Sequence, residues 1–149
     1  KGLLIKNIYN SYKKNLFFKK KYPKSLDRNY FKSYLDKLKE YKKNDAIHTA
    51  SLMTVFSIIN SINFHKIKLN EIILTGGGRK NIFILDKLNE YFKEKNIKVS
   101  LIDKYGFNGD LIESQMFAYL AVRSIKKLPI SIPSTTGVNH PISGGILYK

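Results

Sequence analysis

The chain has 149 residues, with 27 lysines and arginines against 11 aspartates and glutamates and a formal net charge of +16. This length suits one domain with a substantial core rather than two domains. The absence of cysteine excludes disulfides and thiolate metal sites, and no apolar run reaches the roughly 18 residues that a membrane-spanning helix needs.

The first residue is Lys1 rather than an initiating methionine, so we expect a piece of a larger, cytoplasmic protein. The basic excess lies mainly in residues 1–44, which hold 14 basic and 3 acidic residues, whereas residues 45–149 hold 13 and 8. Clustered lysines can neutralise phosphates, so a basic nucleic-acid-binding module stays open as an alternative. Arginine, the usual side chain for bidentate recognition, is scarce, which favours lysines on solvated helix faces and no specific nucleic-acid partner.

Two amphipathic helices are predicted within residues 1–44. The first covers residues 3–17, Pro23 interrupts the pattern, and Ser25 and Asp27 are candidate N-caps of the second helix. The apolar positions of the two helices are Ile5, Ile8, Tyr9, Tyr12 and Leu16, then Phe31, Tyr34, Leu35, Leu38 and Tyr41. Because the aromatic residues share their stripe with leucines, they are more typical of a core than of a surface that stacks on bases.

An α/β core is predicted after Asp45, a candidate N-cap for the buried helix AIHTASLMTVFSIINSI. His48, inside this helix, is interpreted as structural, and the three scattered histidines offer no metal-ligand spacing. The β-branched stretch EIILT then predicts a strand covered on both faces. A helix to about Lys95 follows, and IKVSLI predicts a second strand. This βαβ unit requires a parallel strand pair with a right-handed crossover, so the fold class is α/β.

The apolar positions that mark that helix are Ile82, Leu85, Leu88 and Phe92. Beyond the second strand, the loop DKYGFNG leads into a third, largely buried helix, DLIESQMFAYLAVRSIKKL. Asp110 and Glu113 stand at the spacing of a capping box at its start. The tail is rich in Pro, Gly, Ser and Thr, which predicts an ordered loop or short strand rather than a helix.

Three consecutive glycines, Gly76, Gly77 and Gly78, separate the first strand from its helix. Backbone without side chains can approach a ligand closely, and a helix N-terminus attracts anions, so this turn favours a nucleotide or another anion. The sequence GGGRKN matches neither the dinucleotide-binding nor the P-loop glycine pattern. A tight structural turn therefore stays open as the alternative.

Several motifs occur in order along the chain: PKSLDRNYF, TGGGRKN, GFNGDLIESQMFAYLAVRSIKKLP and LPISIPSTTGVNHPISGGILY. Together they resemble the C-terminal half of the anhydro-N-acetylmuramic acid kinase family over nearly the whole chain. Asn108 departs from the small residue or proline that this family more often carries. The resemblance implies the second lobe of an actin-like, ribonuclease H-like ATPase fold, so residues 1–149 would form a C-terminal lobe fragment with its nucleotide side in residues 45–149.

The same resemblance implies roles for individual residues. Gly76, Gly77 and Gly78 would border the adenosine side of ATP, and Asn81 matches the family's asparagine in the first helical turn. Glu113 matches a family glutamate expected near the sugar. A helix-start residue that only holds the turn remains the alternative for Asn81, as the capping box does for Glu113.

The implied reaction of the complete enzyme is the ATP- and Mg²⁺-dependent opening and phosphorylation of anhydro-N-acetylmuramic acid in peptidoglycan recycling. No catalytic residue is expected in this chain, because the family's D-G-T-S and D-T-G-P motifs and its general base lie in the earlier half. We therefore expect these residues alone to be inactive, and the complete protein to be a homodimer. Another sugar kinase or ATPase of the same fold is the alternative.

Overall fold

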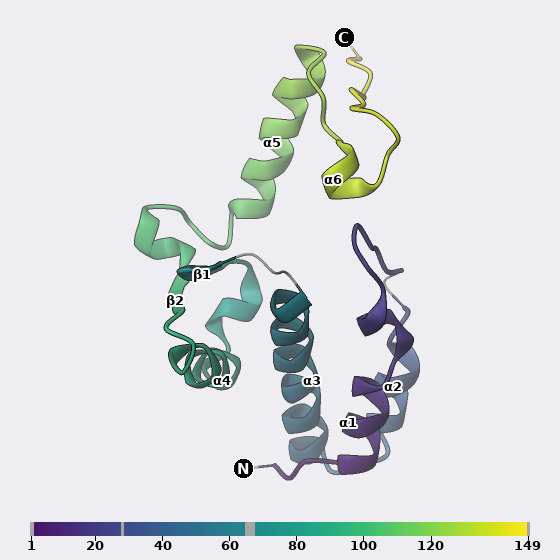
Figure 1. The fold of residues 1–149 in the computed structure, drawn as a ribbon, viewed down its shortest axis with the longest axis vertical. Coiled ribbons are helices and arrows are strands. Elements are labelled where there is room, and N and C mark those ends of the chain that lie inside the picture. Colours follow the sequence, from purple (N-terminus) through teal and green to yellow (C-terminus); the bar gives the residue numbers. More distant parts are fainter. Residues whose placement is uncertain (1, 28, 65–67, 149) are drawn as a thin grey trace.

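The structure of the chain is a computed structural model, and it describes residues 2–27, 29–64 and 68–148. Figure 1 shows the long helix α3 between the N-terminal helices and a small α/β unit, with α5 extending away from that unit. The tail turns back, and Gly137 lies near Pro23 of the N-terminal loop. The helices are α1 (Lys6–Lys13), α2 (Lys32–Leu38), α3 (Lys43–Phe64), α4 (Ile82–Lys93), α5 (Ile112–Ile125) and α6 (Pro133–Thr136). The strands are β1 (Glu71–Leu74) and β2 (Lys98–Leu101), and the 3₁₀ turns are η1 (Leu16–Lys19), η2 (Gly77–Lys80) and η3 (Ile102–Tyr105).

The first predicted helix is divided into α1 and η1. Asn15 causes the division, since its side chain accepts a hydrogen bond from the Phe17 backbone N–H at 2.9 Å and starts a new 3₁₀ turn. This turn buries Phe18 and leaves Leu16 70% exposed, so the predicted helical spacing of Leu16 with the apolar residues before it is wrong. The core between α1, η1, α2 and α3 consists of Ile5, Ile8, Tyr12, Phe18, Leu38 and Met53.

The second helix begins later than its predicted caps. The Asp27 carboxylate accepts a hydrogen bond from the Asn29 backbone N–H at 2.8 Å, which closes a turn ahead of the helix. Phe31 occupies the N-cap position of α2 without a side-chain cap, so the capping roles of Ser25 and Asp27 are wrong. Of the predicted stripe, Leu38 is buried whereas Leu35 and Tyr41 are exposed. Arg28, the arginine of the PKSLDRNYF motif, lies outside the described residues.

Helix α3 begins at Lys43, two positions before its predicted N-cap. Asp45 therefore lies in the first turn, where its carboxylate accepts a hydrogen bond from the Leu3 backbone N–H at 2.6 Å. The fully buried Thr49 accepts another from the Ile5 backbone N–H at 3.0 Å. These bonds attach the N-terminal segment to α3 and satisfy backbone donors that have no helical partner.

Burial of α3 is less complete than its composition predicts. Its buried residues are Thr49, Met53 and Val55, while Ile47 is 53% exposed. His48 lies against the Phe83 ring with 5.0 Å between ring centroids, which agrees with a structural role. In the part of the chain that the structure describes, no helix is long and apolar enough to cross a membrane.

The predicted parallel βαβ unit is confirmed, and with it the α/β class. Strands β1 and β2 pair in parallel in a register that runs from Glu71 beside Lys98 to Leu74 beside Leu101. Helix α4 covers one face through Leu88 and Phe92, both 0% exposed, and Val55 of α3 joins this second core.

The other face of the strand pair is open. Ile73 of β1 is 46% exposed, so the prediction of a strand covered on both faces is wrong for this chain. Ile82 is 73% exposed because it stands at the first position of α4, before the helix has turned towards the core. Ile82 therefore marks the start of the helix, as predicted, without belonging to its buried face.

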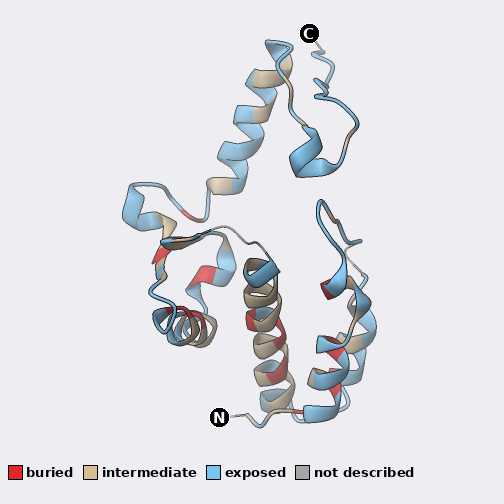
Figure 2. Cartoon of the chain, viewed as in Figure 1, coloured by how far each residue is buried: buried red, intermediate tan, exposed pale blue. Residues whose placement is uncertain are grey.

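Helix α5 exists where it was predicted, but it is not buried. None of its residues is buried, and Figure 2 shows exposed residues along most of its length. Its exposed large apolar residues are Met116, Phe117, Tyr119, Val122 and Ile125. The tail reaches the C-terminal part of α5, where the Ser124 hydroxyl donates to the Gly144 carbonyl, but it does not bury the helix.

The tail mixes a short helix with extended chain. Ser131 and Ile142 form an antiparallel bridge, as expected for a short strand. Between them lies the one-turn helix α6, which was not predicted, with Pro133 at its N-terminus and Gly137 at φ 76° after its end. This proline and glycine are the residues that favour the start and the end of a helix.

Candidate functional site

The glycine turn lies between β1 and α4. Gly76 has φ 74° and ψ 177°, a conformation that is essentially restricted to glycine. Its backbone N–H donates to the Gly109 carbonyl at 3.2 Å. A Cβ at Gly77 or Gly78 would meet no atom of the described residues within 4 Å. The first glycine therefore permits the turn, and the next two border open space.

Arg79 lies directly behind this turn and is 7% exposed. Its guanidinium donates to both carboxylate oxygens of Asp103, from Nε at 2.7 Å and from Nη2 at 3.0 Å. Nη1 donates to Asp110 at 2.7 Å and to the Gly76 carbonyl at 3.1 Å. A buried charge is tolerated when it is paired and hydrogen-bonded in this way.

Gly109 leaves the space that the Arg79 side chain occupies. A Cβ at Gly109 would overlap Nε and Cζ of Arg79. The Gly109 backbone N–H donates to Asp103 at 3.3 Å, and its carbonyl accepts from Gly76. Lys80 forms a more exposed ion pair with Asp110 at 2.6 Å. These contacts join the glycine turn, η3 and the loop before α5 into one hydrogen-bonded unit.

The ion pairs fix the protonation of both aspartates. Hydrogen bonds from Arg79 lower the pKa of Asp103 to about 2, and those from Arg79 and Lys80 lower the pKa of Asp110 to about 2. The two carboxylates in turn raise the pKa of Arg79. A carboxylate with so low a pKa is a poor proton acceptor near neutral pH, so neither aspartate suits general base catalysis.

The structure gives Asn81 the capping role considered for it. Asn81 is the N-cap of α4, and its side-chain oxygen accepts from the Ile84 backbone N–H at 3.2 Å. The amide nitrogen has no partner among the described residues. The side-chain oxygen therefore caps the helix, and the amide nitrogen is available to donate a hydrogen bond.

The capping box at α5 is wrong. Leu111 occupies the N-cap without a side-chain bond, because the Asp110 carboxylate is taken by Arg79 and Lys80. Glu113 is exposed, and within residues 2–27, 29–64 and 68–148 it has no hydrogen bond or ion pair. The structure does not bring Glu113 into contact with the glycine turn.

Sequence reasoning missed Arg79 and Asp103 as members of this site. Asp103 was placed only in the loop DKYGFNG after the second predicted strand, and Asp110 only in the capping box. The available signal was an arginine beside the glycines together with two aspartates placed after the following strand, which a parallel βαβ unit returns to the same edge.

A magnesium ion does not fit the described residues here. The described part of the chain contains no group of three or more His, Asp or Glu side chains that could hold a metal. Asp103 and Asp110 are already neutralised by Arg79 and Lys80, whereas Mg²⁺ requires carboxylate or phosphate oxygens that are free to coordinate it.

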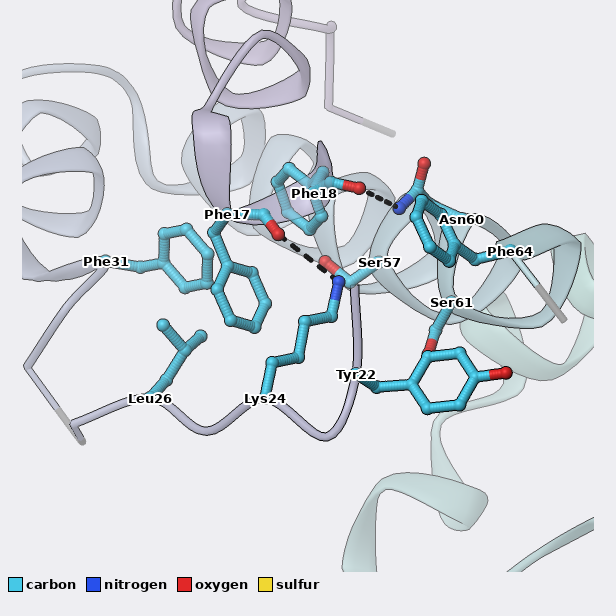
Figure 3. A pocket seen from close by; sticks show the side chains of 10 residues that line it. All are labelled: Phe17, Phe18, Tyr22, Lys24, Leu26, Phe31, Ser57, Asn60, Ser61 and Phe64. Carbon is cyan, nitrogen blue, oxygen red and sulfur yellow. Dashed lines mark hydrogen bonds between the residues drawn. The ribbon is translucent and has the colours of Figure 1, made fainter. Parts of the chain in front are cut away.

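A separate cavity of about 350 Å³ lies between η1, the loop after it and the C-terminal part of α3. Figure 3 shows Lys24 of the PKSLDRNYF motif crossing this cavity. Its ammonium donates to the Phe17 carbonyl at 3.2 Å and lies 4.5 Å from the centroid of the Phe17 ring. On the opposite wall, Asn60 donates to the Phe18 carbonyl at 3.4 Å. Here Lys24 holds the loop against the aromatic core.

Comparison with known proteins gives one family. The family model described as "Anhydro-N-acetylmuramic acid kinase" matches residues 1–149. Proteins of that name are similar to this chain in Zymomonas mobilis, at 34% identity over 99% of the chain, and in Brucella canis, at 34% over 97%. The protein of that name in Pelagibacter ubique is 48% identical over 62% of the chain and 24% of its own length. The chain spans 39% and 38% of the first two relatives.

Proposed function

The chain belongs to the anhydro-N-acetylmuramic acid kinase family, and from this premise we propose that it forms the C-terminal part of such a kinase. The complete protein would use ATP to open anhydro-N-acetylmuramic acid and phosphorylate it to N-acetylmuramic acid 6-phosphate in peptidoglycan recycling. The observation that carries the proposal for this chain is the glycine turn, whose Gly77 and Gly78 border open space.

We propose that this turn binds the adenosine side of ATP. The absence of side chains at Gly77 and Gly78 leaves room for the nucleoside against the backbone. Asn81 supports the same role, because its amide nitrogen is available beside the turn while its oxygen caps α4. Bound ATP supplies the phosphoryl group that is transferred.

The part of this chain in the reaction is to bind and orient. Phosphoryl transfer depends mainly on positioning and charge stabilisation, and a rigid wall for the nucleoside contributes positioning. In the proposed reaction a general base activates water, the water attacks the anomeric carbon, and the oxygen freed by ring opening accepts the phosphoryl group. Asp103 and Asp110 are too weakly basic for the first step, so the base is assigned to sequence outside these residues.

The proposed sugar contact is Glu113. An exposed carboxylate without a partner in the described residues can accept hydrogen bonds from sugar hydroxyls.

The proposed setting is the second lobe of an actin-like fold, supported by the parallel βαβ unit and its flanking helices. A homodimer of the complete protein is part of the same proposal and is supported by the exposed apolar residues of α5.

The test is an ATP-dependent phosphorylation assay on the full-length protein that contains these residues, followed by mass spectrometry. Anhydro-N-acetylmuramic acid is the acceptor, and glucose is the control. We expect a muramic acid phosphate only with the first sugar and only with ATP, and no product from the 149 residues alone. Phosphorylation of glucose instead would assign the protein to another sugar kinase of the same fold, and no product with either sugar would reject the proposal.

A further inference from the structure

We infer that Arg79 is a positioning residue for the nucleotide, because it holds the glycine turn in its open conformation from behind without touching the ligand. This inference rests on the proposed function, since it assigns the open side of the turn to ATP. It goes further by naming the residue that sets the shape of that wall.

Arg79 connects three segments of the chain around the turn. One guanidinium contacts the Gly76 carbonyl, the Asp103 carboxylate in η3 and the Asp110 carboxylate in the loop before α5. The backbone bond from Gly76 to Gly109 closes the same unit at 3.2 Å. Segments that are 24 and 31 positions away from Arg79 are therefore fixed relative to the turn through one side chain.

The site around this side chain is shaped for arginine. A planar guanidinium can bond both oxygens of Asp103 and still direct Nη1 to Asp110 and Gly76, whereas an ammonium has no fixed fork. Gly109 provides the room, because any side chain there would overlap the guanidinium. Without Arg79, Lys80 would be the remaining cation paired with these carboxylates, and it reaches only Asp110.

The position of Arg79 suits a positioning role rather than direct binding. The Arg79 side chain is only 5% exposed, so it cannot form the wall that a nucleotide meets. The open space lies instead beside Gly77 and Gly78. The Gly76 peptide, which Arg79 holds through the carbonyl oxygen, precedes both of these glycines and fixes their orientation.

This geometry predicts a specific kinetic change in the full-length kinase. Adenosine contacts are remote from the reacting phosphate, so loosening the turn removes binding that substrate and transition state share. We expect Arg79→Lys to raise KM for ATP by about threefold and Arg79→Met by about tenfold or more, with kcat and KM for the sugar nearly unchanged. A loss of folded protein alone would instead lower kcat and leave KM for ATP unchanged. Lys87→Ala, which removes the exposed ion pair with Glu90, is the matched control and should change neither constant.

Amide hydrogen exchange followed by mass spectrometry tests the same inference without relying on kinase activity. In Arg79→Lys, peptides covering residues 76–81 should exchange faster than in the wild-type protein, while peptides covering 85–92 in α4 should not change. ATP should protect residues 76–81 in the wild-type protein and protect them less in the variant.

The outcomes separate the two proposals. A wild-type protein that phosphorylates neither sugar rejects the proposed function, and the exchange experiment then still decides the role of Arg79. Unchanged exchange at residues 76–81 in Arg79→Lys overturns the inference, as does an unchanged KM for ATP in an active enzyme. Arg79→Lys keeps the charge, so it remains informative if Arg79→Met does not fold.

Discussion

Replacing the three glycines of the turn one at a time by alanine separates the fold from the ligand. Gly76 has φ 74° and ψ 177°, a region that is essentially closed to residues with a Cβ and costs of order 1–3 kcal/mol when one is forced into it. At about 2–4 °C per kcal/mol, Gly76→Ala should lower the melting temperature by roughly 2–12 °C. Strain within the turn itself should also weaken ATP binding.

Gly77→Ala and Gly78→Ala should have the opposite effect on stability. Both lie in the 3₁₀ turn η2, neither has a positive φ, and a Cβ at either would meet no described atom within 4 Å. Alanine restricts the unfolded chain more than glycine does, so each replacement should leave the stability unchanged or raise it by about 0.4–1 kcal/mol. If the nucleoside lies against this backbone, however, the added methyl group occupies its space and KM for ATP should rise.

Thermal unfolding and ATP kinetics of the three full-length variants, measured side by side, form the assay. The expected pattern is one destabilised variant, Gly76→Ala, and two stable variants with weakened ATP binding. If Gly77→Ala and Gly78→Ala both kept the wild-type KM for ATP, the nucleotide would not use this side of the turn. A wild-type melting temperature for Gly76→Ala would refute the argument from its backbone conformation.

Three further predictions concern the core, the ion pairs and the helix cap. Leu88→Ala should lower the free energy of unfolding by about 2–5 kcal/mol, because Leu88 is 0% exposed. Ile82→Ala, in the same helix but at 73% exposure, should change it by less than about 0.5 kcal/mol. Equal losses of the two variants in denaturant titrations would contradict the core described here. Asp103 has a folded pKa of about 2 against about 3.9 unfolded, so its stabilising effect is complete above about pH 4 and is lost as the pH falls towards 2. Melting temperatures should therefore fall more steeply between pH 4 and pH 2 in the wild-type protein than in Asp103→Asn, and parallel curves would argue against the ion pair. Asn81→Ala removes the helix cap and should lower the stability by about 1 kcal/mol. Asn81→Asp should keep the cap but raise KM for ATP. An unchanged KM for ATP in the aspartate variant would leave Asn81 with the capping role alone.

The βαβ unit could be predicted because its signals are local. The apolar stretch at residues 71–74, the glycines and the period of α4 each occur within a few residues, and the parallel pairing follows from the connection between the strands. The N-terminal helices were placed less well, since Asn15 and Asp27 make turns with residues two positions ahead. Such side-chain bonds compete with helix formation, and they decided where the helices begin and end.

The Arg79 unit could not be predicted in the same way. Asp103 and Asp110 each had a sufficient local interpretation, one as part of a loop and the other as a helix cap. Their common partner lies 24 and 31 positions away from them, and it meets them only after β1 and β2 have paired. The glycine turn itself was evident from the sequence, but the reason it holds its shape depends on these tertiary contacts.

Helix α5 shows what an apolar sequence does and does not determine. Met116, Phe117 and Val122 predicted burial, yet they are 49%, 60% and 50% exposed. The tail, which reaches α5 at Ser124 and Gly144, leaves most of its apolar surface uncovered. Large exposed apolar groups on a single helix are typical of a surface that another part of a protein covers. The chain spans 39% of the Zymomonas mobilis relative that it matches, so a complete protein of that length would include more polypeptide that could supply such a cover. Because Glu113 stands at the start of the same helix, covering α5 would also enclose the proposed sugar contact, and this connects the exposed helix to the proposed substrate site.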